Sequence, residues 1–329
     1  MNILIVGGTR FLGRAIVDAA LGRGHELTLF NRGTTDPALF PGLETILGDR
    51  CHDASKLSGR SFDAVIDVPG MNPGDVRPVV DAVSSFVERY VFVSTVSVYA
   101  DHSTPQVEGQ PVLVPAEGQD PGVAYGAGKA AAEEVVINAF GDKALVARPG
   151  LIVGPHDPTD RFAYWPRRIA RGGRVLAPGG PDHPAQFIDV RDLASWIMTA
   201  AEDGLGGVFN ATGRPTTLGA VLEACQRVVT APSELVWVDD EDLLAAGVNP
   251  WMGVPLWIRV PGWEAHAEVG IERASASGLV FRSLEETVRD TLAWDLARGG
   301  PSQGAEGLSH EWEQELLRQL APVSDAANI

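Results

Sequence analysis

The amino-terminal segment limits the possible folds of this chain more than any other segment. Asn2–Val6 is an almost continuous apolar run, as expected for a β-strand that is buried on both faces. Phe11–Gly22 then carries apolar residues near helical spacing. Gly7, Gly8 and Gly13 lie at the junction, where glycine permits a sharp turn and a close approach of the helix. The segment therefore predicts a strand, a tight turn and a helix.

The same junction predicts a site for a phosphorylated ligand. Peptide N–H groups at the start of a helix attract anions, and glycines let the backbone approach a pyrophosphate closely. A glycine triplet alone is weak support, but its place between a strand and a helix favours a dinucleotide site over a plain turn. Arg10 stands where the usual spacing has its middle glycine. Its side chain either lies along a phosphate or points to solvent.

Short β-rich runs and amphipathic stretches continue to alternate through the first half of the chain. Further strands are expected at 26–30, 64–68, 90–93 and 144–147, and helices at 77–87 and after Tyr125. Strict alternation implies a parallel sheet that is covered by helices on both faces. We therefore predict the α/β class, with a Rossmann-type doubly wound parallel sheet and a smaller, loop-rich α/β substrate domain.

The composition of the sequence changes beyond about residue 150, where Gly and Pro become frequent and aromatic residues recur in predicted loops. A chain of 329 residues suits about two domains. We expect a dinucleotide-binding domain over 1–150, completed by parts of about 186–215, and a substrate-binding domain mainly over 151–296. Residues 297–329 are expected to form a linker, a last helix capped by Ser309, and a tail.

Composition narrows the class of partner. A net charge of −17 disfavours a sequence-independent grip on nucleic acid, but leaves room for a small phosphorylated ligand. No apolar run reaches the roughly 18 residues of a membrane span, and the first residues do not resemble a secretory signal. Cys51 and Cys225 lack CxxC spacing, which is typical of a reducing compartment. We expect a cytoplasmic monomer or homodimer that acts on a small-molecule substrate, without nucleic-acid or membrane partners.

The end of the second predicted strand bears on the choice of cofactor. NAD enzymes commonly place an acid there to bind the adenosine ribose, whereas this chain has Asn31 and Arg32. The planar guanidinium of Arg32 suits a 2′-phosphate, although loop arginines are often merely solvated. We therefore expect NADP(H) to be preferred, with NAD(H) possible. Asp49 and Arg50, after the third strand, are expected to border the adenine.

Tyr125 and Lys129 are four residues apart and should share one helix face. A free tyrosine titrates near pH 10, and a neighbouring cation favours the phenolate and lowers that pKa. Such a pair suits general acid or base catalysis, although the spacing alone also occurs on ordinary surface helices. Ser94 and Thr95 end the preceding apolar strand, so their hydroxyls should project into the crevice where parallel sheets bind ligands.

Together these segments resemble the extended short-chain dehydrogenases/reductases of the NAD-dependent epimerase/dehydratase family. The matching motifs are GGTRFLG at 7–13, FVSTVSVY at 92–99, YGAGK at 125–129, RPGLIVGP at 148–155 and FIDVRDLA at 187–194. They keep the family's order and spacing over roughly residues 1–295. The GGTRFLG and LFNRG forms are similar to an atypical branch that includes bacterial isoflavone-reductase-like proteins and the chloroplast stem-loop RNA-binding proteins.

The resemblance implies roles for individual residues. Tyr125 is the expected general acid/base, Lys129 its activator and a ribose ligand, and Thr95 the hydroxyl that orients the substrate. The expected cofactor-binding set is Gly7, Thr9, Arg10, Phe11, Leu12, Gly13, Asn31, Arg32, Asp49, Arg50, Val68, Pro69, Ser94, Lys129 and Pro149. Arg10, and Pro69 with Gly70, depart from the family's usual residues beside the pyrophosphate and the adenosine.

The loop at 156–168 follows the strand after the catalytic helix and is expected to lie over the crevice. Arg161, Tyr164 and Trp165, together with Gln186, are candidate substrate contacts, although core packing explains Trp165 equally well. The acidic and histidine residues nearby lack ligand spacing, so we expect no metal site; they are His156, Asp157, Asp160 and His183.

Three functions remain open on the sequence. The leading interpretation is an NADP(H)-dependent reductase or dehydrogenase that moves a hydride between nicotinamide and a carbonyl or alcohol carbon. The second is a redox-neutral epimerase or dehydratase of a sugar or sugar nucleotide, which Arg32 disfavours. The third is a non-catalytic dinucleotide sensor or RNA binder, which the acidic charge and the Tyr125–Lys129 pair disfavour.

Overall fold

A computed structural model describes residues 1–301 and 307–321 and divides the chain into two compact units. Unit 1 comprises Met1–Ile152, Phe187–Arg214 and Glu268–Phe281. Unit 2 comprises Val153–Gln186, Pro215–Ala267 and the described residues from Arg282 onward. The units differ from the expected domains chiefly at Glu268–Phe281, which belongs to unit 1.

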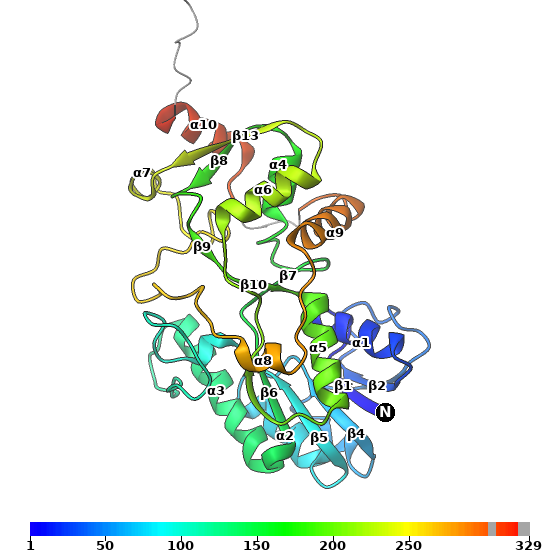
Figure 1. The fold of residues 1–329 in the computed structure, drawn as a ribbon. Coiled ribbons are helices and arrows are strands. Elements are labelled where there is room, and N and C mark those ends of the chain that lie inside the picture. Colours follow the sequence, from blue (N-terminus) through cyan, green and yellow to red (C-terminus); the bar gives the residue numbers. More distant parts are fainter. Residues whose placement is uncertain (302–306, 322–329) are drawn as a thin grey trace, which may run out of the picture. The chain divides into compact units, whose positions relative to one another are not determined.

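Unit 1 is built on a seven-stranded parallel sheet with the order β11-β6-β5-β4-β1-β2-β3 (Figure 1). From β1 the chain adds β2 and β3 on one side, then returns to add β4 and the later strands on the other. Ligands of such doubly wound sheets bind at the carboxyl ends of the strands, where the order reverses. The predicted fold class is confirmed. The strands are β1 (Asn2–Val6), β2 (Glu26–Asn31), β3 (Glu44–Leu47), β4 (Phe62–Asp67), β5 (Val87–Val93), β6 (Ala144–Arg148) and β11 (Gly207–Asn210).

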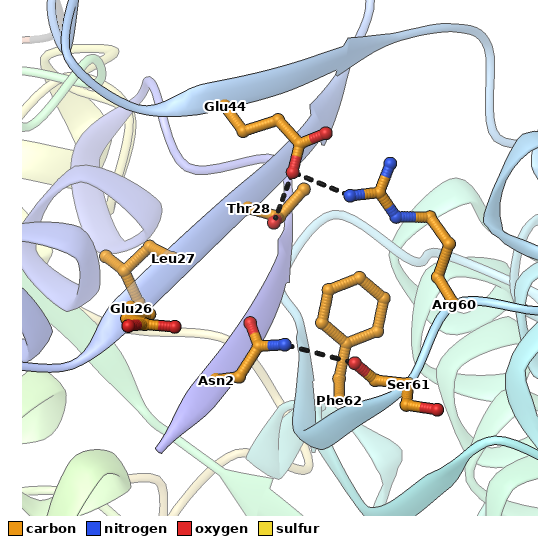
Figure 2. Close-up of a pocket in the computed structure, with 8 residues that line it drawn as sticks. All are labelled: Asn2, Glu26, Leu27, Thr28, Glu44, Arg60, Ser61 and Phe62. Atoms are coloured by element: carbon orange, nitrogen blue, oxygen red, sulfur yellow. Dashed lines mark hydrogen bonds and ion pairs between the residues drawn. The ribbon is translucent and has the colours of Figure 1, made fainter.

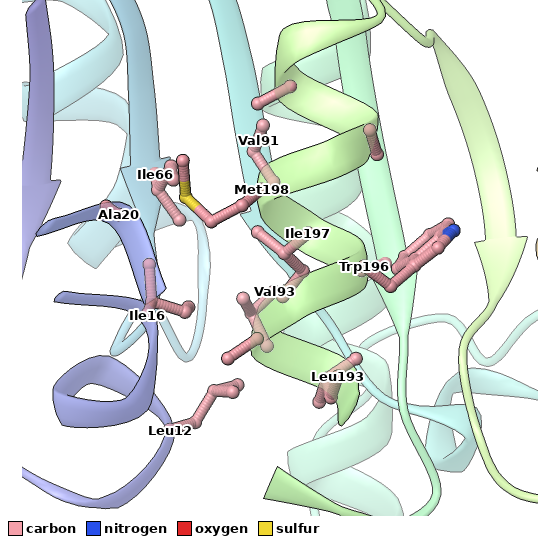
Figure 3. Packing of buried hydrophobic residues seen from close by; sticks show 14 of the residues in the cluster. Leu12, Ile16, Ala20, Ile66, Val91, Val93, Leu193, Trp196, Ile197 and Met198 are labelled. Carbon is pink, nitrogen blue, oxygen red and sulfur yellow. The ribbon is translucent and has the colours of Figure 1, made fainter. Parts of the chain in front are cut away.

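Helices cover both faces of this sheet because neighbouring strand residues point to opposite sides. Ile3 and Ile5 face a core shared with α1 (Phe11–Gly22) and α5 (Val190–Glu202), whose packing appears in Figure 3. Leu4 and Val6 face a second core, completed by α2 (Pro73–Val83) and α3 (Pro121–Phe140). The continuous apolar strands are therefore the result of burial on two faces.

Helix α2 differs from its expected range. It spans Pro73–Val83 rather than 77–87. Asn72 caps it by accepting a hydrogen bond from the Asp75 N–H. A proline fits the first turn because a backbone N–H at that position would have no partner within the helix. Pro78 lies inside the helix. The apolar spacing that marked the helix begins only after these signals, which explains the late predicted start.

Unit 2 contains a parallel pair of strands, β8 (Gly173–Pro178) and β13 (Ser233–Val238). Helices α4 (Tyr164–Ala170), α6 (Leu218–Val228) and α9 (Leu284–Ala297) pack on one another, and α10 (His310–Leu320) packs against β8. The other described elements are β7 (Leu151–Val153), β9 (Pro184–Ala185), β10 (Phe187–Asp189), β12 (Thr216–Thr217), α7 (Asp240–Ala245), α8 (Glu272–Ala276) and the 3-10 helices η1 (Ala54–Leu57), η2 (Val96–Val98) and η3 (Gly141–Lys143).

The last helix is the one expected after Ser309, whose side chain accepts a hydrogen bond from the Trp312 N–H. A buried ion pair between Arg168 and Glu313 fixes it to unit 2, and the Arg174 guanidinium donates to the Ala321 carbonyl at 2.6 Å. The expected linker at 297–307 and the tail lie partly outside the described residues. Within the described ranges no helix is both long and apolar enough to cross a membrane.

Candidate active site

The glycine loop has the backbone geometry that a phosphate site requires. Gly7 and Gly8 have φ angles of 99° and 92°, which side-chain-bearing residues rarely adopt. A Cβ on Gly13 would lie 2.9 Å from the Gly8 nitrogen, so only glycine lets α1 pack this closely on the loop. Arg10, at the N-cap of α1, makes no side-chain cap, and the first turn holds no acid. Peptide N–H groups and the helix dipole therefore favour an anion at this position.

The other loop residues of the predicted cofactor set lie around these glycines. Thr9 and Phe11 are half-buried, and Leu12 is buried in the core under α1. Val68 donates its N–H to the Val6 carbonyl, which continues the β1–β4 pairing past the strands. The Pro69 ring lies beside Gly7, 3.3 Å from where a Cβ would be. The loop after β4 thus closely approaches the glycine loop.

Asn31 shapes the end of β2. Its side-chain amide donates to the Gly7 carbonyl at 3.1 Å, and its oxygen accepts from the Gly33 N–H at 2.8 Å. Arg32 is exposed next to this turn. The pKa of Asp49 is lowered, first by a hydrogen bond from the Cys51 N–H and also by the positive charge of Arg32. Arg32 and Asp49 therefore lie near one another beyond the ends of β2 and β3.

Arg50 has a structural role that the sequence did not indicate. Its guanidinium donates to both carboxylate oxygens of Asp67, at 2.8 and 2.6 Å, and to the Asp75 carbonyl at 2.6 Å. The Tyr90 hydroxyl also donates to Asp67, at 2.7 Å. Asp67 is fully buried at the end of β4, so it needs a cation and hydrogen-bond donors. Its place at the end of an apolar strand was the signal that sequence reasoning missed.

Tyr125 lies in the second turn of α3, close enough to the Thr95 side chain for that group to influence its pKa. Thr95 follows β5, and its hydroxyl oxygen accepts from the Ser97 N–H at 3.1 Å. Tyr125 keeps 38% of its surface exposed, yet partial desolvation raises the pKa of its phenol, and Thr95 partly opposes that rise. The structure thus brings together two side chains that are thirty residues apart in the sequence.

The two glycines between Tyr125 and Lys129 allow this approach. A Cβ on Gly126 would lie 2.1 Å from the Ser97 carbonyl oxygen, and one on Gly128 would lie 3.0 Å from the Met71 carbonyl oxygen. Helix α3 therefore packs directly against the loops that follow β5 and β4. The glycines do not act chemically, but they place the side chains on either side of them.

Lys129 is buried, with 3% of its surface exposed. Its ammonium donates to the carbonyls of Gly70 and Val93, at 2.6 and 2.5 Å, and lies 4.6 Å from the centre of the Phe92 ring. Burial lowers the pKa of Lys129 to about 8, while the charge of Asp67 opposes the change. The expected lowering of the Tyr125 pKa is not found, because burial of the phenol dominates and the lysine is directed at the two carbonyls.

Two further residues of the predicted cofactor set, Ser94 and Pro149, are buried near the carboxyl ends of β5 and β6. The Ser94 hydroxyl donates to Glu133, and its own N–H donates to the Ala147 carbonyl at 2.7 Å. Pro149 is buried, and its carbonyl accepts from the Val96 N–H at 2.9 Å. Both residues therefore help to fix the carboxyl ends of β5 and β6.

The candidate substrate contacts lie in or beside unit 2. Trp165 is fully buried and donates its indole N–H to the Pro255 carbonyl at 2.8 Å, and Tyr164 is buried against it. Both rings therefore serve core packing, the alternative that the sequence left open for Trp165. Arg161 lies 4.8 Å from the centre of the Trp251 ring, and Arg161 and Gln186 both keep part of their surface exposed.

The residues weighed as metal ligands have other contacts. His156 packs edge-on against Trp294, and Asp160 pairs with Arg167 and Arg298. His183 accepts a hydrogen bond from the Ile258 N–H at 3.3 Å. Among residues 1–301 and 307–321, no group of three or more His, Cys, Asp or Glu side chains is arranged to hold a metal ion.

A cavity of about 390 Å³ opens at the amino-terminal ends of the strands, on the opposite side of the sheet from the glycine loop (Figure 2). It is lined from β1 to β4 near their amino ends, with Glu44 paired to Arg60 at 2.6 Å and hydrogen-bonded to Thr28. Parallel sheets of this type bind ligands at their carboxyl edge. Polar side chains that line this cavity also hydrogen-bond to one another, so the cavity does not belong to the candidate active site.

Comparison with known proteins agrees with this geometry. Residues 3–211 match the family described as the NAD dependent epimerase/dehydratase family. The chain is 28% identical to the chloroplast stem-loop binding protein of 41 kDa b of Arabidopsis thaliana, over 69% of this chain but only 62% of that protein. It is 30% identical to a 2-alkyl-3-oxoalkanoate reductase of Stenotrophomonas maltophilia, over 70% of this chain and 77% of the relative.

Two other comparisons extend over most of the chain. A 4-hydroxy-2-methyl-3-oxo-4-farnesyl-3,4-dihydroquinoline-1-oxide ketoreductase of Stigmatella aurantiaca is 27% identical over 99% of this chain and 98% of the relative. The fold is that of UDP-glucuronic acid 4-epimerase from Bacillus cereus, solved in complex with NAD, with a TM-score of 0.63, 15% identity, and coverage of 89% and 98%. With the glycine loop and the Tyr125–Lys129 helix in place, the chain belongs to the NAD dependent epimerase/dehydratase family, as an NAD(P)-dependent enzyme of the extended short-chain dehydrogenase/reductase type.

Proposed function

We propose that this protein is an NADP(H)-dependent reductase or dehydrogenase, which moves a hydride between nicotinamide and a carbonyl or alcohol carbon. The observation that carries the proposal is the position of α3, which presents Tyr125 and Lys129 one helical turn apart and packs directly against the loop that begins at Thr95. Two of the relatives are named as reductases of ketone-bearing compounds, which supports the same chemistry.

The protonation state of Tyr125 suits it to act as an acid toward a carbonyl oxygen. Because burial raises the pKa of its phenol, the hydroxyl keeps its proton at neutral pH. A reduced nicotinamide, when bound, would supply the hydride to the carbonyl carbon. The Tyr125 hydroxyl then donates its proton to the carbonyl oxygen, and the Thr95 hydroxyl orients that oxygen. The product is an alcohol: the hydride brings two electrons and one proton to the carbon, and Tyr125 gives the second proton to the oxygen.

Lys129 has a different part in this mechanism. Its ammonium is fixed by two carbonyls at the ends of β4 and β5, beside the place where the sheet order reverses. Because the ammonium is directed at these carbonyls, we do not assign it to the Tyr125 phenol. The family resemblance assigns it to the ribose of the cofactor. Its charge is needed for that role.

The end of β2 supports the preference for NADP(H). Asn31 is occupied in shaping the turn, and no carboxylate follows it to bind an unphosphorylated ribose. The exposed guanidinium of Arg32 is the group we assign to a 2′-phosphate. The neighbouring carboxylate of Asp49 weakens this assignment by charge, which makes Arg32 the position to test.

A screen for net cofactor consumption tests the proposal. We would incubate the protein with NADPH and a panel of aldehydes, ketones and sugar nucleotides, and follow the loss of NADPH absorbance. A reductase consumes NADPH in step with the alcohol formed. Conversion of a sugar nucleotide without net NADPH consumption would instead identify the epimerase or dehydratase reaction. If no carbonyl compound is reduced and no cofactor binds, the proposed function is wrong.

A further inference from the structure

Three side chains of α3 follow one another along one face of the helix. Tyr125, Lys129 and Glu133 are each four residues apart, a spacing that aligns them. Lys129 and Glu133 are both only 3% exposed. The proposed reaction assigns roles to Tyr125 and Lys129 but none to the buried carboxylate of Glu133. An ionised carboxylate is costly to bury unless it is paired and hydrogen-bonded, so its contacts should reveal its role.

Glu133 connects the catalytic helix to the end of the strand that carries Thr95. One carboxylate oxygen accepts from the Ser94 hydroxyl and from Arg148 Nε at 2.9 Å, and the other accepts from Arg148 Nη2 at 2.6 Å. Ser94 is the residue immediately before Thr95 and is itself buried. Glu133 therefore fixes the backbone of Thr95 through its hydrogen bond with the preceding residue, Ser94.

Arg148 is held in turn by its other neighbours. It ends β6 and lies 4.9 Å from the centre of the Tyr99 ring. The Tyr99 hydroxyl donates to the Asn210 side-chain oxygen at 2.7 Å, which reaches the end of β11. The carboxylate thus belongs to a rigid buried network that crosses the carboxyl ends of three neighbouring strands.

The charge of Glu133 also reaches Lys129. The charged groups around the lysine are Asp67 at the end of β4, Arg50 after β3, Asp75 on α2, and Glu133 on its own helix. Asp67, Glu133 and Asp75 favour the ammonium, whereas Arg50 and burial disfavour it. Burial prevails, so the lysine keeps its charge at neutral pH by a narrow margin.

Resting on the proposed function, we propose that Glu133 is a positioning residue of the reaction. Its carboxylate, fixed by Arg148, holds the Ser94 hydroxyl so that Thr95 stays beside Tyr125. It also sets a negative charge one helical turn from the Lys129 ammonium. A single buried side chain thereby aligns the substrate-orienting hydroxyl and maintains the cation of the catalytic pair.

The charge effect can be measured without any substrate. The chain has only three lysines, Lys56, Lys129 and Lys143, so carbon-13-labelled lysine gives three side-chain NMR signals to titrate with pH. Glu133→Gln removes the negative charge and should lower the titration midpoint of Lys129 by roughly half a pH unit or more, while the exposed Lys56 and Lys143 keep theirs. Glu202→Gln is the matched control, because that carboxylate also pairs with an arginine, Arg23, but lies on α5. It should leave all three midpoints unchanged.

In Glu133→Gln, Arg148 would stay buried without its ion-pair partner and the protein could fail to fold. A second variant is therefore tested in parallel. Glu133→Leu combined with Arg148→Met removes both charges and keeps the volume filled. The Lys129 midpoint should fall here as well. If either variant folds and the Lys129 midpoint equals that of the wild type, the proposed charge effect is refuted. Because no turnover is needed, this result does not depend on the proposed function.

The alignment effect has its own readout. Ser94→Ala removes one hydroxyl and leaves the ion pair, so it should lower kcat by about tenfold without moving the Lys129 midpoint. With Glu133→Gln, the alkaline limb of the pH–rate profile should move to lower pH together with the lysine midpoint. A merely structural role would change thermal stability alone. Wild-type kcat in Ser94→Ala would show that the hydroxyl does not hold Thr95 in place.

Discussion

Desolvation shifts the pKa values of two neighbouring side chains of the candidate active site in opposite directions. It raises the pKa of the Tyr125 phenol and lowers that of Lys129 to about 8, because in each case it disfavours the charged form. Below pH 8 the pair therefore consists of a neutral acid and a cation. Such a pair provides a proton donor in Tyr125 and a positive charge in Lys129.

Replacement of Tyr125 by Phe removes the proposed acid and keeps the ring for packing. We expect turnover to fall by about 10²–10⁴-fold, the usual contribution of general acid–base catalysis, with NADPH affinity hardly changed. Steady-state kinetics and a cofactor titration would check both. For comparison, Lys129→Ala should weaken cofactor binding as well as turnover, and Thr95→Ala should slow the reaction more mildly. A Tyr125→Phe enzyme with wild-type turnover would show that another group carries the proton.

The lysine also makes stability depend on pH. Its folded pKa lies below its unfolded value of 10.5, so between about pH 8 and 10.5 the unfolded chain binds the extra proton. The burial cost of Lys129 is thus present below pH 8 and is lost as pH rises through that window. Lys129→Met lacks this cost at any pH. Its advantage over the wild type in the free energy of unfolding should shrink by about 2–3 kcal/mol between pH 7 and pH 10. Urea unfolding at both pH values measures the difference, and a constant difference would contradict it.

Arg32 is the residue on which the cofactor preference depends. Arg32→Ala should reduce the preference for NADPH over NADH by about 1–3 kcal/mol, the size of a charge-assisted hydrogen bond. Affinities for all four nicotinamide forms would be compared by titration in wild type and variant. An unchanged preference would mean that Arg32 is only a solvated loop residue.

At the scale of elements, the position of α3 depends on how closely its backbone can approach two loops. Gly126→Ala places a methyl group 2.1 Å from the Ser97 carbonyl oxygen, so the helix or the loop must move. We expect a loss of about 1–3 kcal/mol in the free energy of unfolding and lower turnover, because Tyr125 separates from Thr95. Gly22→Ala in α1 is the control, since a Cβ there meets no atom within 4 Å. It should be neutral or stabilising, and equal effects of the two substitutions would contradict the argument.

The sequence predicted those elements whose signals are local. The buried strands, the glycine loop and the Ser309 cap follow from residue types at fixed spacings, whereas the roles of Tyr125 and Thr95 were implied by the family resemblance. It did not predict the Arg50–Asp67 and Arg148–Glu133 pairs, because their partners are brought together only by the folded sheet. Glu313 shows the same limit: it lies among charged residues of a polar helix, yet it is buried against Arg168.

At the scale of the whole molecule, the glycine loop joins strand, turn and helix into one body, so a bound cofactor should stabilise all of unit 1. NADPH at 100 times its dissociation constant should add roughly 2.7 kcal/mol to the free energy of unfolding. Thermal unfolding with and without NADPH would show the shift, and adenosine alone serves as the control for binding without the phosphates. No shift with either nicotinamide cofactor would remove the basis of the proposed function.

The way in which the chain passes between its two units has a consequence for its synthesis. Unit 1 is completed only by Glu268–Phe281, and unit 2 only by α10, whose Glu313 neutralises the buried charge of Arg168. Domains generally fold one after another as they leave the ribosome. Here neither unit has all of its parts until more than four-fifths of the residues have been translated. Until then the part of the unit 1 core that Ala274 and Leu279 complete stays uncovered, and it is during this interval that we expect chaperones to bind.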